Sequence, residues 1–215
     1  SRMPKTGVDY ADAQITVYRS CPYGCKYCWA SRIPLMKSRI QRGKYDPMEE
    51  AKRICRMKSG KRVVVSFTTD PYPPEKNSVK LTFRVLEHLF LRGKQHEIMI
   101  LTKNPYLPRF REIPYFWQIN DGDFLSNILL GTTVTTLNVE KAREIEPHAP
   151  NPFFRLQALK EARKYCYTWL SIEPIIPGVT DPVEIIEHTA GFIDFYVLGR
   201  LNYPYLLGIK EEKVV

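Results

Sequence analysis

Short apolar or β-branched runs alternate along this chain with longer segments in which apolar residues recur at helical spacing. The short runs predict six strands, at residues 14–18, 62–68, 97–102, 128–134, 167–172 and 192–198. The helical spacing predicts four helices, at residues 47–57, 79–91, 152–164 and 182–187. The stretch 104–123 is rich in Pro and aromatic residues, and we expect a long loop there, with a short helix within it as the alternative. Strands that alternate with helices indicate βαβ units and an α/β fold with a parallel sheet.

This alternation fits an open doubly wound sheet or a curved partial barrel, and both folds bind ligands at the carboxyl ends of the strands. The segments with the most polar and reactive residues each follow a predicted strand: 21–28, 68–75, Lys103, 135–138 and 173–178. We therefore expect these segments to meet at one mouth. The 215 residues show no compositional break, which predicts a single domain over residues 1–215 with terminal extensions at about 1–12 and 200–215.

The formal net charge of +9 would attract a polyanion through phosphate contacts. The basic residues are spread along the chain, with the densest runs at 37–44 and 52–62, so a solvated basic surface is an equally simple explanation. The longest apolar stretches fall well short of the roughly 20 residues that cross a bilayer, and we expect no membrane association. Five cysteines, three of them close together, fit a reducing cytoplasm better than a disulfide framework.

Cys21, Cys25 and Cys28 form a tight group, and Gly24 between them allows the backbone to wrap around a compact inorganic core. A structural zinc site would need a fourth Cys or His, and the other candidates lie far along the chain. A [4Fe-4S] cluster with three thiolate ligands has the opposite requirement, because its fourth iron must stay open for another ligand. From the residues alone, an iron-sulfur cluster, zinc and a chance pattern all remain possible.

The spacing C-x3-C-x2-C, with Tyr27 before the last cysteine, resembles the signature of the radical S-adenosylmethionine (SAM) superfamily. The resemblance implies a partial (β/α)6 barrel of parallel strands with the cluster loop after the first strand. Cys21, Cys25 and Cys28 would be the catalytic ligands of a [4Fe-4S] cluster. By the same resemblance the reduced cluster would cleave SAM to methionine and a 5′-deoxyadenosyl radical, and an electron donor such as a flavodoxin or ferredoxin would supply the electron.

Further blocks look like those of the spore photoproduct lyase-like (DNA repair photolyase-like) branch, and they span most of the chain: 66–72, 101–104, 131–137, 146–150 with 155–156, and 173–178. Spore photoproduct lyase itself uses a cysteine near the end of the second strand as a hydrogen donor. Phe67 stands at the similar position here and has no labile hydrogen. We therefore do not expect the same reversal of a thymine dimer.

The superfamily contacts the methionyl amine of SAM at the end of the second strand, so Thr68, Thr69 and Asp70 are candidates for that contact. A strand-end turn would also explain these three residues, since Asp-Pro commonly begins a turn. Lys103 and Arg155 are cations that could pair with the cofactor carboxylate, for which Arg has bidentate geometry. A solvated helix face is the alternative for Arg155.

The adenosyl end of the cofactor needs an apolar shelf and hydrogen-bonding groups. Tyr27 is a candidate for the adenine shelf, with ordinary packing as the alternative. Thr133 and Thr135 are candidates for ribose or carboxylate contacts, although alternating Thr is also common in strands. Ile176 is a candidate for an apolar wall against the adenine, in a segment that would equally suit a turn.

The leading hypothesis is a cytoplasmic radical SAM enzyme that acts on a nucleic acid or nucleotide, from the branch resemblance and the positive charge. One alternative is radical modification of a peptide or small molecule. Another is a nucleic-acid-binding protein in which the metal site is structural. The sequence does not indicate the oligomeric state.

Overall fold

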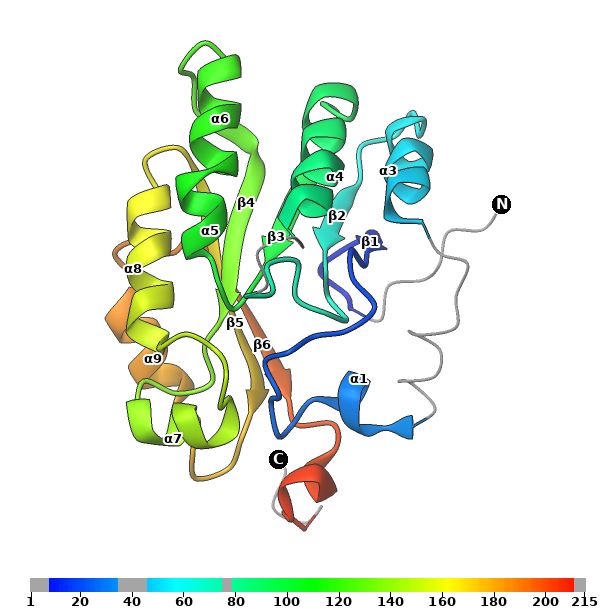
Figure 1. The fold of residues 1–215 in the computed structure, drawn as a ribbon. Helices are drawn as coiled ribbons and strands as arrows, with labels where there is room; N and C mark the ends of the chain where they lie inside the picture. Colours follow the sequence, from blue (N-terminus) through cyan, green and yellow to red (C-terminus); the bar gives the residue numbers. More distant parts are fainter. Residues whose placement is uncertain (1–7, 35–45, 75–78, 211–215) are drawn as a thin grey trace.

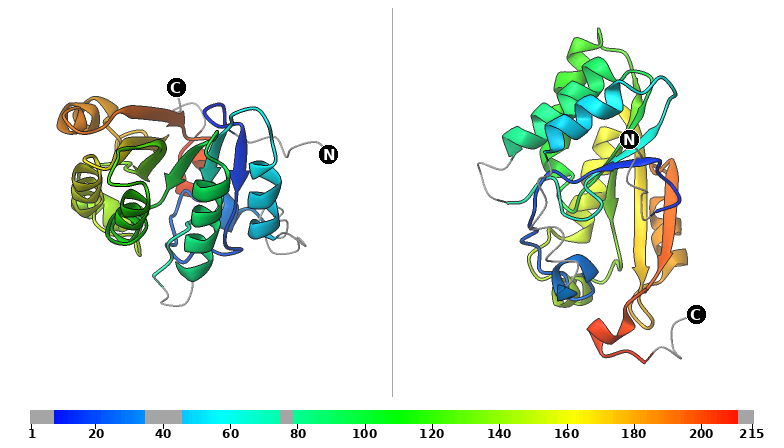
Figure 2. Two further views of the ribbon diagram at one scale, coloured as in Figure 1. Left: turned by 90° about the horizontal axis from the view of Figure 1, so that it is seen from above. Right: turned by 90° about the vertical axis from the view of Figure 1, so that its right-hand side faces the viewer.

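The computed structural model describes residues 8–34, 46–74 and 79–210, and the basic run at 37–44 lies outside them. Six strands form one parallel sheet in chain order. They are β1 (Ala13–Ile15), β2 (Arg62–Val65), β3 (Glu97–Leu101), β4 (Leu125–Thr133), β5 (Cys166–Ile175) and β6 (Phe195–Arg200). The sheet curls into a half-barrel with the helices on its outer side (Figures 1 and 2). The predicted partial barrel of six parallel strands is confirmed.

The helices connect successive strands, as parallel pairing requires. They are α1 (Trp29–Arg32), α3 (Pro47–Cys55), α4 (Val79–Arg92), α5 (Tyr106–Phe110), α6 (Glu112–Ile119), α7 (Val139–Ile145), α8 (Pro152–Ala162) and α9 (Pro182–Thr189), followed by a 3-10 turn, η1 (Pro204–Leu207). The four predicted helices are present, with ends shifted by one or two residues. Within the described ranges, no helix has the length and apolar character needed to cross a membrane.

The predicted loop at 104–123 is wrong, because α5 and α6 occupy most of it. Pro108 and Pro114 are each the third residue of their helix. In the first turn of a helix the backbone amide has no intrahelical acceptor, so Pro costs no hydrogen bond there. Ile113 and Phe116 of α6 are completely buried, which ties this helix to the core.

The second predicted strand, 62–68, is too long at its carboxyl end. Ser66 has a φ of 66°, which ends the extended conformation after Val65. Its amide donates to the carbonyl of Ile15 at 2.7 Å, and its hydroxyl accepts from the amide of Val17 at 3.3 Å. These bonds join the ends of β1 and β2. The segments that follow the two strands therefore leave the sheet at the same edge.

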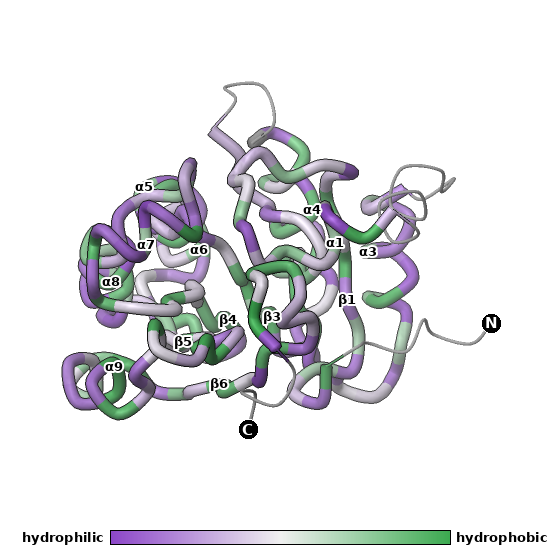
Figure 3. The backbone as a smooth tube through the Cα atoms, turned by 90° about the horizontal axis from the view of Figure 1, so that it is seen from below, coloured by the Kyte–Doolittle hydropathy of each residue, from purple (hydrophilic) through white to green (hydrophobic). Residues whose placement is uncertain are grey.

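The strands bury both faces. Val63, Val65 and Ile98 face the helices in the main core, whereas Val64, Met99 and Trp169 form a second cluster on the inner side of the curl. Figure 3 shows the hydrophobic residues gathered along the strands, with more hydrophilic residues on the helices. Buried side chains on both faces explain why these strands have apolar runs rather than strict alternation.

Gly131 of β4 leaves the space that the indole of Trp169 occupies. A Cβ at position 131 would lie 2.3 Å from the indole ring, which is too close for any contact. We expect Gly131→Ala to lower the free energy of unfolding by about 1–3 kcal/mol, the usual cost of overpacking. Urea unfolding measures this, with Gly191→Ala as the control because no atom lies within 4 Å of its added Cβ. Equal stability of the two variants would contradict the packing argument.

Candidate iron-sulfur and cofactor site

One pocket opens at the carboxyl ends of the strands, and each of the six strands, or the loop after it, lines the pocket. The predicted convergence is confirmed for the segments 21–28, 68–75 and 173–178 and for Lys103, whereas residues 135–138 do not line this pocket. Nine of the residues singled out in the sequence line it: Cys21, Cys25, Cys28, Tyr27, Thr68, Thr69, Asp70, Lys103 and Thr133. Phe67 and Leu101 also line the pocket and pack against the inner cluster, which forms an apolar floor.

The cysteine loop approaches the pocket from β1. Gly24 has a φ of 64°, which favours glycine, and a Cβ there would lie 3.1 Å from the ring of His148. Cys25 is buried, with an exposed fraction of 7%, whereas Cys21 and Cys28 are partly exposed. The loop thus places three thiols along one wall of the pocket.

The thiols suit a cluster better than a single ion. In the described part of the chain, no three Cys, His, Asp or Glu side chains converge closely enough to hold one metal ion. In a [4Fe-4S] cluster each thiolate binds a different iron atom, so the ligands surround a larger group. The five cysteines, all within the described ranges, are thiols rather than disulfides. The donor set at the pocket therefore fits an iron-sulfur cluster.

The surroundings of the loop raise the pKa values of two of its thiols. Burial raises the pKa of Cys25 to about 12, although the nearby Lys103 lowers it in part. Burial and the charge of Asp70 raise the pKa of Cys21. Thiols with raised pKa values, such as buried Cys25 and partly exposed Cys21, become thiolates readily only when a metal centre replaces their protons.

Asp70 organises the ends of β2 and β3. Its carboxylate accepts from the hydroxyl of Thr102 at 2.7 Å and from the amides of Lys103 and Tyr72 at 2.6 and 2.8 Å. Burial raises its pKa, and these three hydrogen bonds oppose that shift. Thr69 donates its hydroxyl to the carbonyl of Tyr18 at 2.7 Å. Thr68 lies beside them in the pocket wall.

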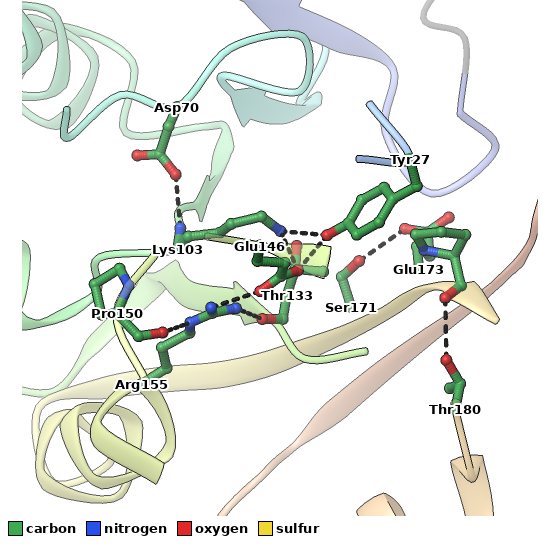
Figure 4. A network of polar contacts seen from close by, with 11 residues as sticks. Tyr27, Asp70, Lys103, Thr133, Glu146, Pro150, Arg155, Ser171, Glu173 and Thr180 are labelled. Atoms are coloured by element: carbon green, nitrogen blue, oxygen red, sulfur yellow. Dashed lines mark hydrogen bonds and ion pairs between the residues drawn. The ribbon is translucent and has the colours of Figure 1, made fainter. Parts of the chain in front are cut away.

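Tyr27, Lys103 and Arg155 contact one carboxylate, that of Glu146 (Figure 4). The Tyr27 hydroxyl donates to Glu146 and accepts from Lys103 Nζ at 2.9 Å. Lys103 Nζ lies 3.1 Å from Glu146 Oε1. Burial would lower the pKa of Lys103, but Glu146 and Cys25 outweigh it and raise the pKa, so the ammonium stays charged.

Three expected cofactor contacts lie outside the pocket lining. Arg155 is buried behind it and donates to the carbonyls of Pro150 and Thr133 at 2.7 and 2.8 Å and to Glu146 Oε2 at 2.5 Å. Thr135 is buried, and Ile176 is buried in the turn after β5. The solvated helix face proposed as the alternative for Arg155 is wrong, because its side chain has an exposed fraction of 1%.

Sequence reasoning did not select Glu146 or Glu173 as site residues. Glu173 lines the pocket on β5, accepts from the Ser171 hydroxyl at 2.9 Å, and occupies the space where a Cβ of Gly199 would lie 2.2 Å away. Its place directly after a predicted strand was a usable signal. Glu146 stood in the block 146–150 that resembles the branch, but nothing in the sequence indicated its role, because its partners are distant in sequence.

Comparisons with known proteins agree with this geometry. The sequence model of the radical SAM superfamily matches residues 15–193, from β1 into the segment before β6. An uncharacterized protein of Methanocaldococcus jannaschii is 29% identical over 207 residues, which cover 92% of this chain and 73% of that relative.

Proposed function

We propose that this chain, which belongs to the radical SAM superfamily, holds a [4Fe-4S] cluster through Cys21, Cys25 and Cys28 and binds SAM in the pocket beside them. Members of the superfamily are enzymes that use these two cofactors. The observation that carries the assignment of ligands is the position of the three thiols on one wall of the pocket at the carboxyl ends of the strands.

When bound and reduced, the cluster and SAM together supply a radical that abstracts hydrogen, and the protein supplies position and shelter. Cys21, Cys25 and Cys28 would bind three of the irons and would leave the fourth for SAM. Thr68 also lines the pocket. Phe67 and Leu101, backed by the inner cluster, keep water away from the floor of the pocket.

The substrate that we infer is a nucleic acid or nucleotide. The net charge of +9 favours a polyanion, and the pocket is lined by Arg200 and by the aromatic rings of Trp29 and Tyr203, which suit phosphate and base contacts. The branch resemblance of the sequence blocks supports the same class. We further propose a cytoplasmic setting with a flavodoxin or ferredoxin as the electron donor.

Anaerobic reconstitution with iron and sulfide, followed by reduction with dithionite in the presence of SAM, tests the proposal. We expect a [4Fe-4S] spectrum and formation of 5′-deoxyadenosine. Bound zinc with no cleavage would contradict the cofactor assignment. Labelled DNA and RNA test the substrate class: binding that weakens steeply with salt, together with an altered nucleotide, supports it, and cleavage of SAM without either result contradicts it.

A further inference from the structure

The cysteine loop rests on a segment that is distant in sequence, residues 144–148 at the end of α7. The Lys26 amide donates to the carbonyl of Ile145 at 2.8 Å, and the His148 amide donates to the carbonyl of Tyr23 at 3.4 Å. Lys26 Nζ also lies 3.4 Å from Glu144, in a pair whose side chains are 43% and 71% exposed. This segment therefore supports the loop from outside the pocket through backbone and surface contacts.

Glu146 connects this segment to polar side chains deep in the interior. Its side chain has an exposed fraction of 1%, and it receives the Tyr27 hydroxyl, Lys103 Nζ and Arg155 Nη2 (Figure 4). Tyr27 stands directly before Cys28, so the hydrogen bond fixes the stretch between two of the three cysteines. Glu146 thereby links the cysteine loop to the end of β3 and to α8.

The carboxylate is ionised in this position. Burial alone would raise its pKa, but Lys103 and Arg155 outweigh burial and lower the pKa to about 2. With both cations charged, the network carries one net positive charge close to Cys25. Without the carboxylate, the same place would hold uncompensated cations, and Arg155 could not release its charge.

We propose that Glu146 is a positioning residue for the iron-sulfur centre, which anchors the loop through Tyr27 and balances the cations beside Cys25. This inference rests on the proposed function, since it takes the three cysteines as the cluster ligands. The charge around a cluster helps to set its reduction potential, and hydrogen-bonded neighbours of ligands control how firmly a metal centre is held. Two separate properties of the bound cluster should therefore depend on Glu146.

Three variants separate these properties. Glu146→Gln removes the charge and weakens the anchor, and Tyr27→Phe removes the anchor and keeps the charge. Glu144→Gln makes the same chemical change as the first variant in an exposed pair on the same segment. The reconstituted proteins are compared by the rate at which an iron chelator removes iron and by potentiometric titration of the reduced cluster, with circular dichroism to establish folding.

We expect Glu146→Gln to lose iron about tenfold faster than the parent, because the Tyr27 hydroxyl loses its charged acceptor and charge-assisted hydrogen bonds are the stronger ones. Its reduction potential should shift upward, since added net positive charge favours the reduced cluster. Tyr27→Phe should lose iron faster with a potential close to that of the parent, and Glu144→Gln should match the parent in both.

Parent behaviour of Glu146→Gln in both measurements would overturn the inference. If Glu146→Gln fails to fold, the iron-loss rate of Tyr27→Phe decides, and a parent rate there overturns the anchoring role. A parent protein that assembles no [4Fe-4S] cluster would instead overturn the proposed function, so the two failures are distinguishable.

Discussion

Cys25→Ala is expected to abolish cluster binding and cleavage of SAM. Loss of a neighbour that only supports a metal ligand costs roughly 10–100-fold in affinity or activity, so loss of a ligand itself should reduce 5′-deoxyadenosine formation by at least about 100-fold. Cys25 is also the most enclosed of the three thiols, and solvent has little access to replace it as a ligand. Iron and sulfide analysis and the 5′-deoxyadenosine assay, both under anaerobic conditions, measure the effect.

Cys55→Ala is the matched control. Cys55 ends α3 and donates its thiol weakly to the carbonyl of His88 at 3.8 Å, outside the pocket lining. Its loss should leave iron content and SAM cleavage within about twofold of the parent, as is usual for a free cysteine that packs as a small apolar side chain. Equal iron content in both variants would show that the cluster does not depend on Cys25.

The strands and their shared mouth were predictable because their signals are local. Apolar runs such as 62–65 and 97–101 mark buried parallel strands, and parallel strands joined by helices bring their carboxyl ends to one edge. The three cysteines were equally accessible, since their spacing within one short loop carries the signal. Neither inference required knowledge of contacts between distant residues.

The helices between β3 and β4 were missed because Pro was interpreted as a breaker of regular structure. Whether Pro108 and Pro114 interrupt a helix depends on their position in it, and the sequence does not show where each helix starts. α7 was also missed. This helix has only seven residues, so its periodic signal is short. Its start is marked by Asn138, whose side chain accepts from the amide of Lys141 at 3.0 Å.

The block 146–150 with 155–156 marks Glu146 and Arg155 in the sequence, but it does not show which residues they contact. Tyr27, Lys103 and Arg155 approach one carboxylate from three elements. Arg155 also donates to two backbone carbonyls, which any residue could supply. The charge of Arg155 suggested a contact with the carboxylate of the cofactor. In the structure its N–H groups instead donate to acceptors of the protein, behind the pocket.

Arg155→Met should lower the free energy of unfolding by about 3–5 kcal/mol, the usual effect of removing one partner from a buried ion pair. The variant leaves Glu146 with a single cation and leaves the carbonyls of Pro150 and Thr133 without their donor. Urea unfolding of the protein without its cofactors measures the loss and keeps it apart from any effect on the cluster. Arg155→Lys should recover only part of it, because one ammonium cannot reach three acceptors in the plane of a guanidinium.

Arg163→Met provides the control, since Arg163 pairs with Asp194 at 2.9 Å while its side chain is 45% exposed. An exposed pair of this kind contributes about 0–1 kcal/mol, so this variant should remain close to the parent in stability. Equal losses at the two positions would mean that the buried contacts of Arg155 contribute no more stability than the exposed pair of Arg163. A large loss at Arg155 alone would mean that this arginine acts through Glu146 and the two carbonyls, and that the cation expected to meet the cofactor instead supports the wall of its pocket.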